Sequence, residues 1–168
     1  MSYYLGIFGG VGTNPSAALL KGKKIIAFAE EERFNRIKNA PLALPLNAIF
    51  YCLKKAKISI NRIKEISFGW DCPHQFNIVP KKFKKIYLKH GGLRNRYNLN
   101  LEDRIRLGYD PDKIINEIKW AFAKKEQKFN KKIIYYKHHL SHAASTFYPS
   151  GFKKSSILIL DGMGEEFT

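Results

Sequence analysis

The sequence contains very little cysteine: Cys52 and Cys72 are the only two among 168 residues. Small domains held together by disulfides carry more cysteines at regular spacings, so a disulfide framework is excluded as the basis of this fold. We therefore expect two ordinary thiols of the kind found in a reducing compartment.

Long apolar runs are also missing. No stretch of the sequence approaches the roughly 18 apolar residues that a membrane-spanning helix requires. Residues Met1 to Tyr4 lack the basic start and apolar core of a signal peptide. We therefore expect a cytoplasmic protein without a membrane partner.

Acidic residues are scarce compared with basic ones: 14 Asp and Glu stand against 30 Lys and Arg, a net charge of +16. Such an excess is compatible with binding nucleic acid or anionic lipid. The lysines are spread along the chain, however, and the densest cluster is residues 81–85, followed by Lys89, Arg94 and Arg96. A solvated basic face is the simpler interpretation, and we do not expect nucleic acid as the partner.

A glycine motif for dinucleotides is absent. Gly9, Gly10 and Gly12 do not have the spacing GxGxxG, and no helix is predicted directly after them. A Rossmann-type site is therefore not expected.

What is present indicates one folded domain over residues 1–168, because hydrophobic residues make up 45% and aromatic residues 14% of the chain. Helical spacing of apolar residues predicts a helix over 46–57, and a proline-led start predicts another from 111 to about 129. Shorter helices are expected around 80–89 and over 143–148, with the rest of 74–110 irregular. Strands are predicted at 3–8, 16–20, 24–29, 63–70, 131–136 and 156–160.

This order of elements predicts an α/β fold, a mixed five-stranded sheet with flanking helices. The first three strands follow one another at hairpin spacing, with a tight turn at Lys21–Lys23. The last predicted strand, 156–160, resembles the first strand of a further unit.

Three of the five histidines lie within five residues: His138, His139 and His142. On a helix, His138 and His142 are four positions apart and point to the same side. Two imidazoles at this spacing can share one divalent metal ion. The alternative is a partly buried histidine cluster satisfied by backbone carbonyls.

A candidate third ligand, Asp161, stands at the end of the predicted strand 156–160. A carboxylate in this position can bind a metal ion. Gly162 and Gly164 follow, and glycines there would allow a phosphate to approach the backbone.

Five short segments occur in an order that is specific in combination and spans nearly the whole chain, although residues 74–130 match poorly. They are Ser16–Leu20, Ala29–Arg36, Phe68–Asp71, His138–Ser145 and Leu160–Glu166. Together they resemble the N-terminal region of the O-carbamoyltransferase family, which includes nodulation and antibiotic carbamoyltransferases.

The resemblance implies half of an actin-like ATPase (ribonuclease H-like) fold, similar to the ATPase domain that attaches threonylcarbamoyl groups to tRNA. Complete members of the family use ATP and carbamoyl phosphate to form a carbamoyl-adenylate, and then transfer the carbamoyl group to a hydroxyl of a small acceptor. They also carry the second half of the ATPase fold and an adenylate-forming domain, neither of which is found in these 168 residues.

We therefore expect the N-terminal part of a carbamoyltransferase, arising from a truncated gene, a split gene or an excerpt, that does not transfer carbamoyl groups alone. An exposed apolar surface is expected to favour a complementing chain or a homo-oligomer. The alternative is a non-enzymatic basic protein that binds RNA or another polyanion.

The same resemblance implies roles for individual residues. His138 and Asp161 stand where the family's iron-type metal ligands stand, and His142 fits the HxxxH pattern of the wider group; magnesium and manganese are the alternative metals. Lys38 matches a lysine that contacts the nucleotide ATP, where its charge would neutralise phosphate oxygens. The alternative for Lys38 is one surface lysine among many.

The sequence departs from the family pattern at the position of the proposed base. The family has a His-Asp pair just before the strand 16–20, whereas this chain has Thr13 and Asn14. Neither side chain acts as a base near neutral pH, so no catalytic residue is assigned. His74 and His90 lie in the poorly matched region.

Several other polar residues have two interpretations. The run Glu30–Glu32 could hold a metal or form a solvated strand end, and Arg33 and Arg36 could pair with these carboxylates or with a substrate phosphate. Trp70 and Asp71 could line the acceptor pocket, or Trp70 could belong to the core.

Overall fold

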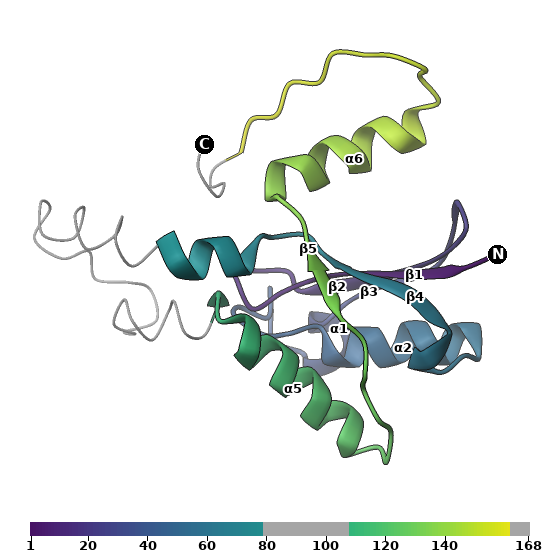
Figure 1. Cartoon of the computed structure of the whole chain (residues 1–168), viewed down its shortest axis with the longest axis vertical. Coiled ribbons are helices and arrows are strands. Elements are labelled where there is room, and N and C mark those ends of the chain that lie inside the picture. The colour runs from purple at the N-terminus through teal and green to yellow at the C-terminus, as the bar shows by residue number, and fades with distance from the viewer. Residues whose placement is uncertain (79–107, 162–168) are drawn as a thin grey trace, which may run out of the picture.

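The strands form one five-stranded sheet with the order β3-β2-β1-β4-β5. The computed structural model describes residues 1–78 and 108–161 (Figure 1). Neighbouring strands are antiparallel from β1 to β3, whereas β4 runs parallel to both β1 and β5. The predicted mixed five-stranded sheet is confirmed. The strands are β1 (Tyr3–Phe8), β2 (Ser16–Lys21), β3 (Lys24–Glu30), β4 (Ile63–Phe68) and β5 (Ile133–Tyr135).

A tight turn joins β2 to β3, as predicted. Lys21 pairs with Lys24, which leaves only Gly22 and Lys23 in the loop. Gly22 has a φ of +59°, which glycine adopts without steric cost. Two-residue hairpin loops favour such positive φ values because their twist matches that of the strands.

The start of α5 and the end of α6 have recognisable caps. Asp110 accepts hydrogen bonds from the backbone N–H groups of Asp112 and Lys113 at the start of α5. Gly151, with a φ of +76°, follows the last residue of α6. No helix in the described part of the chain is long and apolar enough to cross a membrane. The helices are α1 (Glu32–Asn35), α2 (Leu46–Ala56), α5 (Pro111–Ala123) and α6 (His138–Ser150), with a 3-10 turn at Ile60–Arg62.

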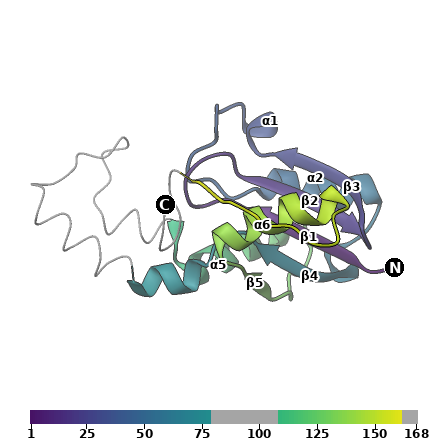
Figure 2. The ribbon, with the colours of Figure 1, turned by 90° about the horizontal axis from the view of Figure 1, so that it is seen from above.

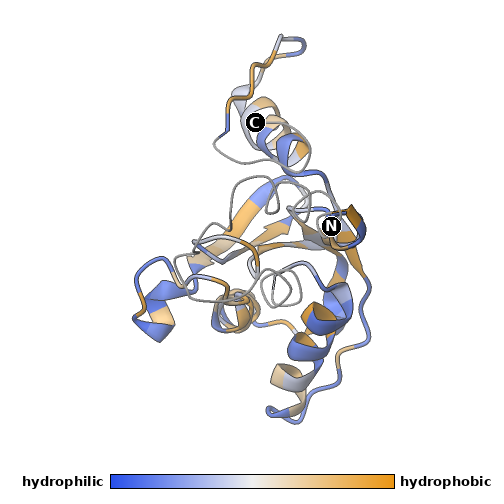
Figure 3. Cartoon of the chain, turned by 90° about the vertical axis from the view of Figure 1, so that its left-hand side faces the viewer, coloured by the Kyte–Doolittle hydropathy of each residue, from blue (hydrophilic) through white to orange (hydrophobic). Residues whose placement is uncertain are grey.

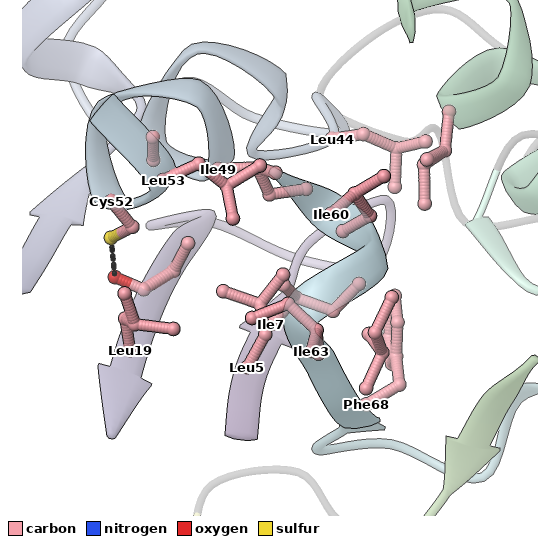
Figure 4. Close-up of a cluster of buried hydrophobic side chains, with 14 of the residues drawn as sticks. Leu5, Ile7, Leu19, Leu44, Ile49, Cys52, Leu53, Ile60, Ile63 and Phe68 are labelled. Carbon is pink, nitrogen blue, oxygen red and sulfur yellow. Dashed lines mark hydrogen bonds between the residues drawn. The ribbon is translucent and has the colours of Figure 1, made fainter. Parts of the chain in front are cut away.

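The hydrophobic core lies on one face of the sheet, beneath α2 and α5 (Figure 1). Alternate residues of β1 and β2 point into it, for example Leu5 and Ile7 of β1, so the period of two expected for a half-buried sheet is present in these strands. The rings of Phe50 on α2 and Phe122 on α5 are 4.7 Å apart and join the two helices. Figure 4 shows the part of this core where α2 packs on the sheet.

Cys52 belongs to the same core. Its thiol donates to the carbonyl oxygen of Ala17 at 3.5 Å, and burial raises the pKa of Cys52 to about 11. Cys72 is also buried, and neither residue forms a disulfide. Both are buried free thiols.

Helix α6 lies on the other side of the sheet from α2 and α5 (Figures 1 and 2). None of its residues is buried. It begins at His138, five residues before the predicted helix 143–148, and includes Pro149. The histidines therefore belong to the helix itself.

Two predictions about the later part of the chain are wrong. Residues 156–160 do not form a strand, since no strand of the described chain offers them a partner for a hydrogen-bonded ladder. Leu158 and Leu160 are 83% and 82% exposed, and Figure 3 shows this apolar segment extending beyond α6.

The second wrong prediction is irregular structure from residue 74, because residues 72–78 are helical. Pro73 stands in the first turn of this helix, where its missing N–H is not needed. Cys72 and Gln75 anchor the helix through buried side chains. The helix expected around 80–89 lies outside the described residues.

Candidate metal centre

The candidate site lies where three parallel strands end. β1, β4 and β5 run in the same direction, so their carboxyl ends meet at one edge of the sheet. This edge is the usual ligand-binding side of a parallel sheet. Helix α6 starts there with His138, only three residues after the end of β5.

The structure brings together the three residues that the sequence singled out as metal ligands. Nε2 of His138 is 2.9 Å from Oδ2 of Asp161, and Nε2 of His142 is 3.1 Å from the same oxygen. The two histidine nitrogens are 3.0 Å apart. The three donor atoms therefore form a nearly equilateral triangle, and they are the group in the described residues whose geometry could hold a metal ion.

The size of this triangle indicates a coordination geometry. Donor atoms about 3.0 Å apart that each lie about 2.1 Å from a common ion subtend angles of about 90° at that ion. Such angles correspond to one face of an octahedron, whereas the tetrahedral angles typical of structural zinc sites need more widely spaced donors. Two imidazoles and one carboxylate in a facial arrangement are typical of iron(II) sites.

A backbone hydrogen bond fixes the orientation of His138. Its Nδ1 lies 3.2 Å from the carbonyl oxygen of Gly69, just beyond β4. A carbonyl only accepts, so this contact places a proton on Nδ1 and, in the neutral ring, leaves a lone pair on Nε2. In the neutral ring that lone pair faces the Asp161 carboxylate at 2.9 Å, and a cation placed there would bond to both atoms.

Two aromatic rings pack against the ring of His138. The buried ring of Trp70 lies 4.4 Å from the His138 ring between centroids, and Phe8 lies 6.0 Å away in a stacked arrangement. Trp70 thus belongs to the core and also supports a candidate ligand. Its indole N–H is buried and has no hydrogen-bond acceptor within the described residues.

The centre is open on the side of His142. The side chain of His142 is 48% exposed, compared with 15% for His138 and 26% for Asp161. A ligand can therefore approach from solvent while His138 remains anchored in the sheet.

Lys38 lies in a loop that is tied to the loop after β1. Asn14 N–H donates to the carbonyl of Asn39, and Leu42 N–H donates to that of Gly12. Lys38 itself is exposed. No hydrogen bond or ion pair links it to the three donor atoms among the residues that the structure describes.

The loop that carries Lys38 has several residues in a left-handed backbone conformation. Arg36, Asn39, Ala40 and Leu42 all have positive φ values, a conformation that costs free energy and persists only where the surroundings impose it. Gly9 is needed for the same contact, since a Cβ there would lie 2.7 Å from the carbonyl oxygen of Ala43.

The acidic run after β3 has a structural explanation. The buried carboxylate of Glu31 accepts hydrogen bonds from the N–H groups of Asn47 and Ala48 and from the Asn47 side chain, and so caps α2. Glu30 and Glu32 both pair with Arg33 at 2.9 Å. The run is therefore not a solvated strand end, because Glu31 is a buried cap and Glu30 and Glu32 are partly buried. For Arg33 the structure favours the pairing with carboxylates.

The remaining predicted positions lie apart from the centre or outside the described residues. Thr13 and Asn14 are exposed in the loop after β1. Gly162 and Gly164, assigned to nucleotide binding, and His90 lie outside the described residues. Sequence reasoning did not identify the Gly69 carbonyl, whose only signal is its place just after a strand parallel to β5.

A comparison with known families identifies the family of this chain. The model of the carbamoyltransferase N-terminus matches residues 7–168. This chain belongs to the carbamoyltransferase N-terminal family. The predicted resemblance is therefore confirmed, and the matched range includes all three donor residues.

Two curated relatives align with most of this carbamoyltransferase N-terminal chain. The uncharacterized protein sll1178 of Synechocystis sp. is 32% identical over 155 residues, and the nodulation protein NolNO of Sinorhizobium fredii is 30% identical over 152 residues. Each alignment covers 89% of this chain, but the chain spans only 24% and 19% of the two relatives.

Among solved structures, YeaZ from Pseudomonas aeruginosa is similar at 12% identity with a TM-score of 0.36. That alignment covers 81% of this chain and 43% of YeaZ. A likeness of this strength carries no argument about fold or function.

Proposed function

We propose that this chain forms the metal-binding part of an ATP-dependent carbamoyltransferase. In this proposal, His138, His142 and Asp161 bind one divalent ion of the iron type, with magnesium or manganese as alternatives. ATP and carbamoyl phosphate are the substrates, and a hydroxyl group of a small molecule is the acceptor. Membership of the carbamoyltransferase N-terminal family supports carbamoyl as the transferred group.

The observation that carries the metal proposal is the triangle of donor atoms, together with the orientation of His138. Each donor atom lies within 3.1 Å of the other two. The Gly69 carbonyl accepts a hydrogen bond from Nδ1 of His138, which leaves the lone pair of Nε2 for the ion. A histidine cluster satisfied only by backbone carbonyls would not direct two imidazoles and a carboxylate to one point.

Three protein ligands leave coordination positions free for oxygen atoms of a substrate. A divalent ion there would polarise a phosphoryl or carbonyl oxygen and stabilise the charge that develops on it. Lys38 would add positive charge near the phosphates, and Gly162 and Gly164 would allow their close approach to the backbone.

The acceptor's proton needs a base that this part of the chain does not place at the family position. Thr13 stands there, and a hydroxyl of its ordinary acidity cannot take a proton near neutral pH. We therefore propose that the described residues contribute metal and nucleotide binding, and that the chain alone does not transfer carbamoyl groups.

Metal analysis of purified variants tests the centre. We expect about one equivalent of iron-type metal in the wild type after reconstitution with Fe²⁺ under anaerobic conditions. Loss of one of three ligands should weaken binding at least about 100-fold in His138→Ala and His142→Ala, by analogy with the 10- to 100-fold effect of losing mere outer-shell partners. His139→Ala is the matched control, since His139 lies in the same helix but outside the triangle.

Equal metal content in the wild type and in His138→Ala would overturn the assignment. Circular dichroism of each variant separates loss of a ligand from loss of the fold. The polyanion alternative gains no support from the described residues, because the densest lysine cluster, 81–85, lies outside them.

A further inference from the structure

Strand β5 forms one end of the sheet, and its outer edge is open. It is the terminal strand in the order β3-β2-β1-β4-β5, and within residues 1–78 and 108–161 no strand pairs with its outer side. The N–H of Tyr136, one residue after β5, donates to the carbonyl oxygen of Phe68 on β4 at 2.9 Å. Successive residues of a strand direct their backbone groups to opposite edges, so the N–H and C=O groups of Ile133 and Tyr135 point away from β4.

A groove of about 530 Å³ lies beside this edge, between α5 and β5 (Figures 1 and 2). We call it the α5–β5 groove. Ile133 and Tyr135 contribute to its lining from β5, and Pro111 and Ile115 contribute from α5. The two residues that turn their backbone groups outward therefore also line the groove. This is the geometry in which an extended peptide adds to a sheet, with its backbone paired to the strand and alternate side chains in contact with the groove.

The charged side chains that line the α5–β5 groove are all lysines. They are Lys119 on α5, and Lys131 and Lys132 directly before β5. The Lys131 ammonium group donates to the carbonyl oxygens of Asn61 and Ile63 at 3.1 and 2.6 Å. Lys119 and Lys132 are exposed and form no ion pair with any residue that the structure describes. Two unpaired cations beside apolar side chains complement a ligand that carries carboxylates.

Lysines on an edge strand can also serve only to prevent the addition of another strand. Protection alone does not require a groove, whereas here apolar side chains such as Ile115, Phe129 and Ile133 line one. The Lys131 ammonium group, moreover, is bound at the start of β4 and not at the outer edge of β5. The arrangement therefore fits a site for a ligand of opposite charge better than a protected edge.

We propose that the α5–β5 groove binds an extended acidic peptide, which adds to β5 as a sixth strand of the sheet. The peptide backbone pairs with the outward N–H and C=O groups of Ile133 and Tyr135, and its carboxylates lie beside Lys119 and Lys132. Apolar side chains of the peptide contact the lining of the groove. This inference does not depend on the metal centre or on carbamoyl transfer.

Fluorescence anisotropy with a labelled eight-residue peptide of alternating valine and glutamate tests the role of charge. The wild type should bind it with a dissociation constant below about 1 mM. Combining Lys119→Glu with Lys132→Glu should weaken binding at least about ten-fold, because two attractive charge pairs become repulsive. Lys124→Glu is the matched control and should change binding less than about two-fold. Lys124 also belongs to the end of α5, but its ammonium group lies 3.6 Å from the centre of the Trp120 ring and not in the groove.

Two N-methylated forms of the same peptide test the backbone pairing without any change of charge. All N–H groups on one edge of an extended alternating peptide belong to its valines, and those on the other edge belong to its glutamates. Methylation of the residues that face β5 removes these donors and places methyl groups against the strand. One of the two forms should therefore bind at least about ten-fold more weakly than the parent peptide, while the other keeps most of its affinity.

No binding of the peptide at millimolar concentration would overturn the proposal. Equal binding to the wild type and to the double variant, with native circular dichroism for both, would assign the peptide to another surface. Equal affinity of both methylated forms and the parent would exclude strand addition. A peptide of alternating valine and lysine that binds as well, or a single-stranded oligonucleotide that binds in place of the acidic peptide, would contradict the assigned class of ligand.

Discussion

Among individual side chains, the candidate centre depends most on how His138 is held. The Gly69 carbonyl fixes one ring nitrogen, and Trp70 lies against the ring at 4.4 Å between centroids. A metal ligand positioned by a backbone hydrogen bond and a packed ring loses little freedom on binding an ion. Within the described residues no backbone group bonds to the His142 ring, and its side chain is 48% exposed, so it is the ligand that can adjust to the ion.

Substitution of Trp70 tests the packing around this ligand. Trp70→Ala should lower the free energy of unfolding by about 3–5 kcal/mol, because it removes a large buried side chain. Trp70→Phe should cost clearly less than Trp70→Ala, because it leaves a smaller cavity. It keeps a ring against His138, and the N–H that it removes has no acceptor among the described residues.

Urea denaturation followed by circular dichroism measures both changes. Equal destabilisation by Phe and Ala would contradict the account, because it would mean that the indole N–H makes an essential hydrogen bond.

Local spacing predicted that His138 and His142 lie together, but not what supports them. Asp161 was expected at the end of a strand that does not form, so its place beside the histidines did not follow from spacing. The histidines are four positions apart, so helical geometry alone puts them on one side. Gly69 and His138, in contrast, are 69 positions apart, and their contact exists only because β4 and β5 are neighbours in the sheet. No pattern within either segment could have indicated it.

Among the helices and strands, the end of β3 is joined to the start of α2 by Glu31. Its carboxylate accepts three hydrogen bonds from Asn47 and Ala48 in the first turn of α2, and the Glu31 side chain is buried. A negative charge also interacts favourably with the helix N-terminus. This contact holds one end of the loop that carries Lys38.

Glu31→Ala should lower the free energy of unfolding by about 2–3 kcal/mol, because buried N–H groups lose a charged acceptor. Glu30→Ala is the matched control and should change it by less than about 1 kcal/mol, since its pair with Arg33 is exposed. Thermal or urea denaturation of both variants measures the difference. Equal effects of the two substitutions would show that Glu31 is not the anchor of α2.

The elements that were predicted correctly are those whose ends depend on local chemistry. The turn at Gly22 and the start of α5 at Asp110 and Pro111 follow from residue types next to each other in sequence. The prediction of a strand at 156–160 was wrong because a strand also needs a neighbour, and a continuous apolar run cannot supply one.

Across the described structure as a whole, the two faces of the sheet differ. One face is covered by α2 and α5 and contains the core, whereas the other carries the exposed Ile25 and Phe28, with α6 on its side (Figure 1). The candidate centre lies beyond the carboxyl ends of the parallel strands β1, β4 and β5. A site at this place is rigid on the sheet side and accessible from the side of α6.

The central claim is that His138, His142 and Asp161 bind one metal ion beside Trp70. The chain has two tryptophans, and Trp120 is exposed on α5. Trp120→Phe therefore leaves the fluorescence of Trp70 as a local reporter. A Co²⁺ ion quenches an indole only at short range, so quenching reports binding at the centre.

The most direct measurement is a Co²⁺ titration of Trp120→Phe, followed by tryptophan fluorescence. The account predicts saturable quenching at about one equivalent of Co²⁺, reversal by EDTA, and loss of quenching when His142→Ala is added. Unchanged Trp70 fluorescence throughout the titration, or equal quenching with and without His142→Ala, would contradict it.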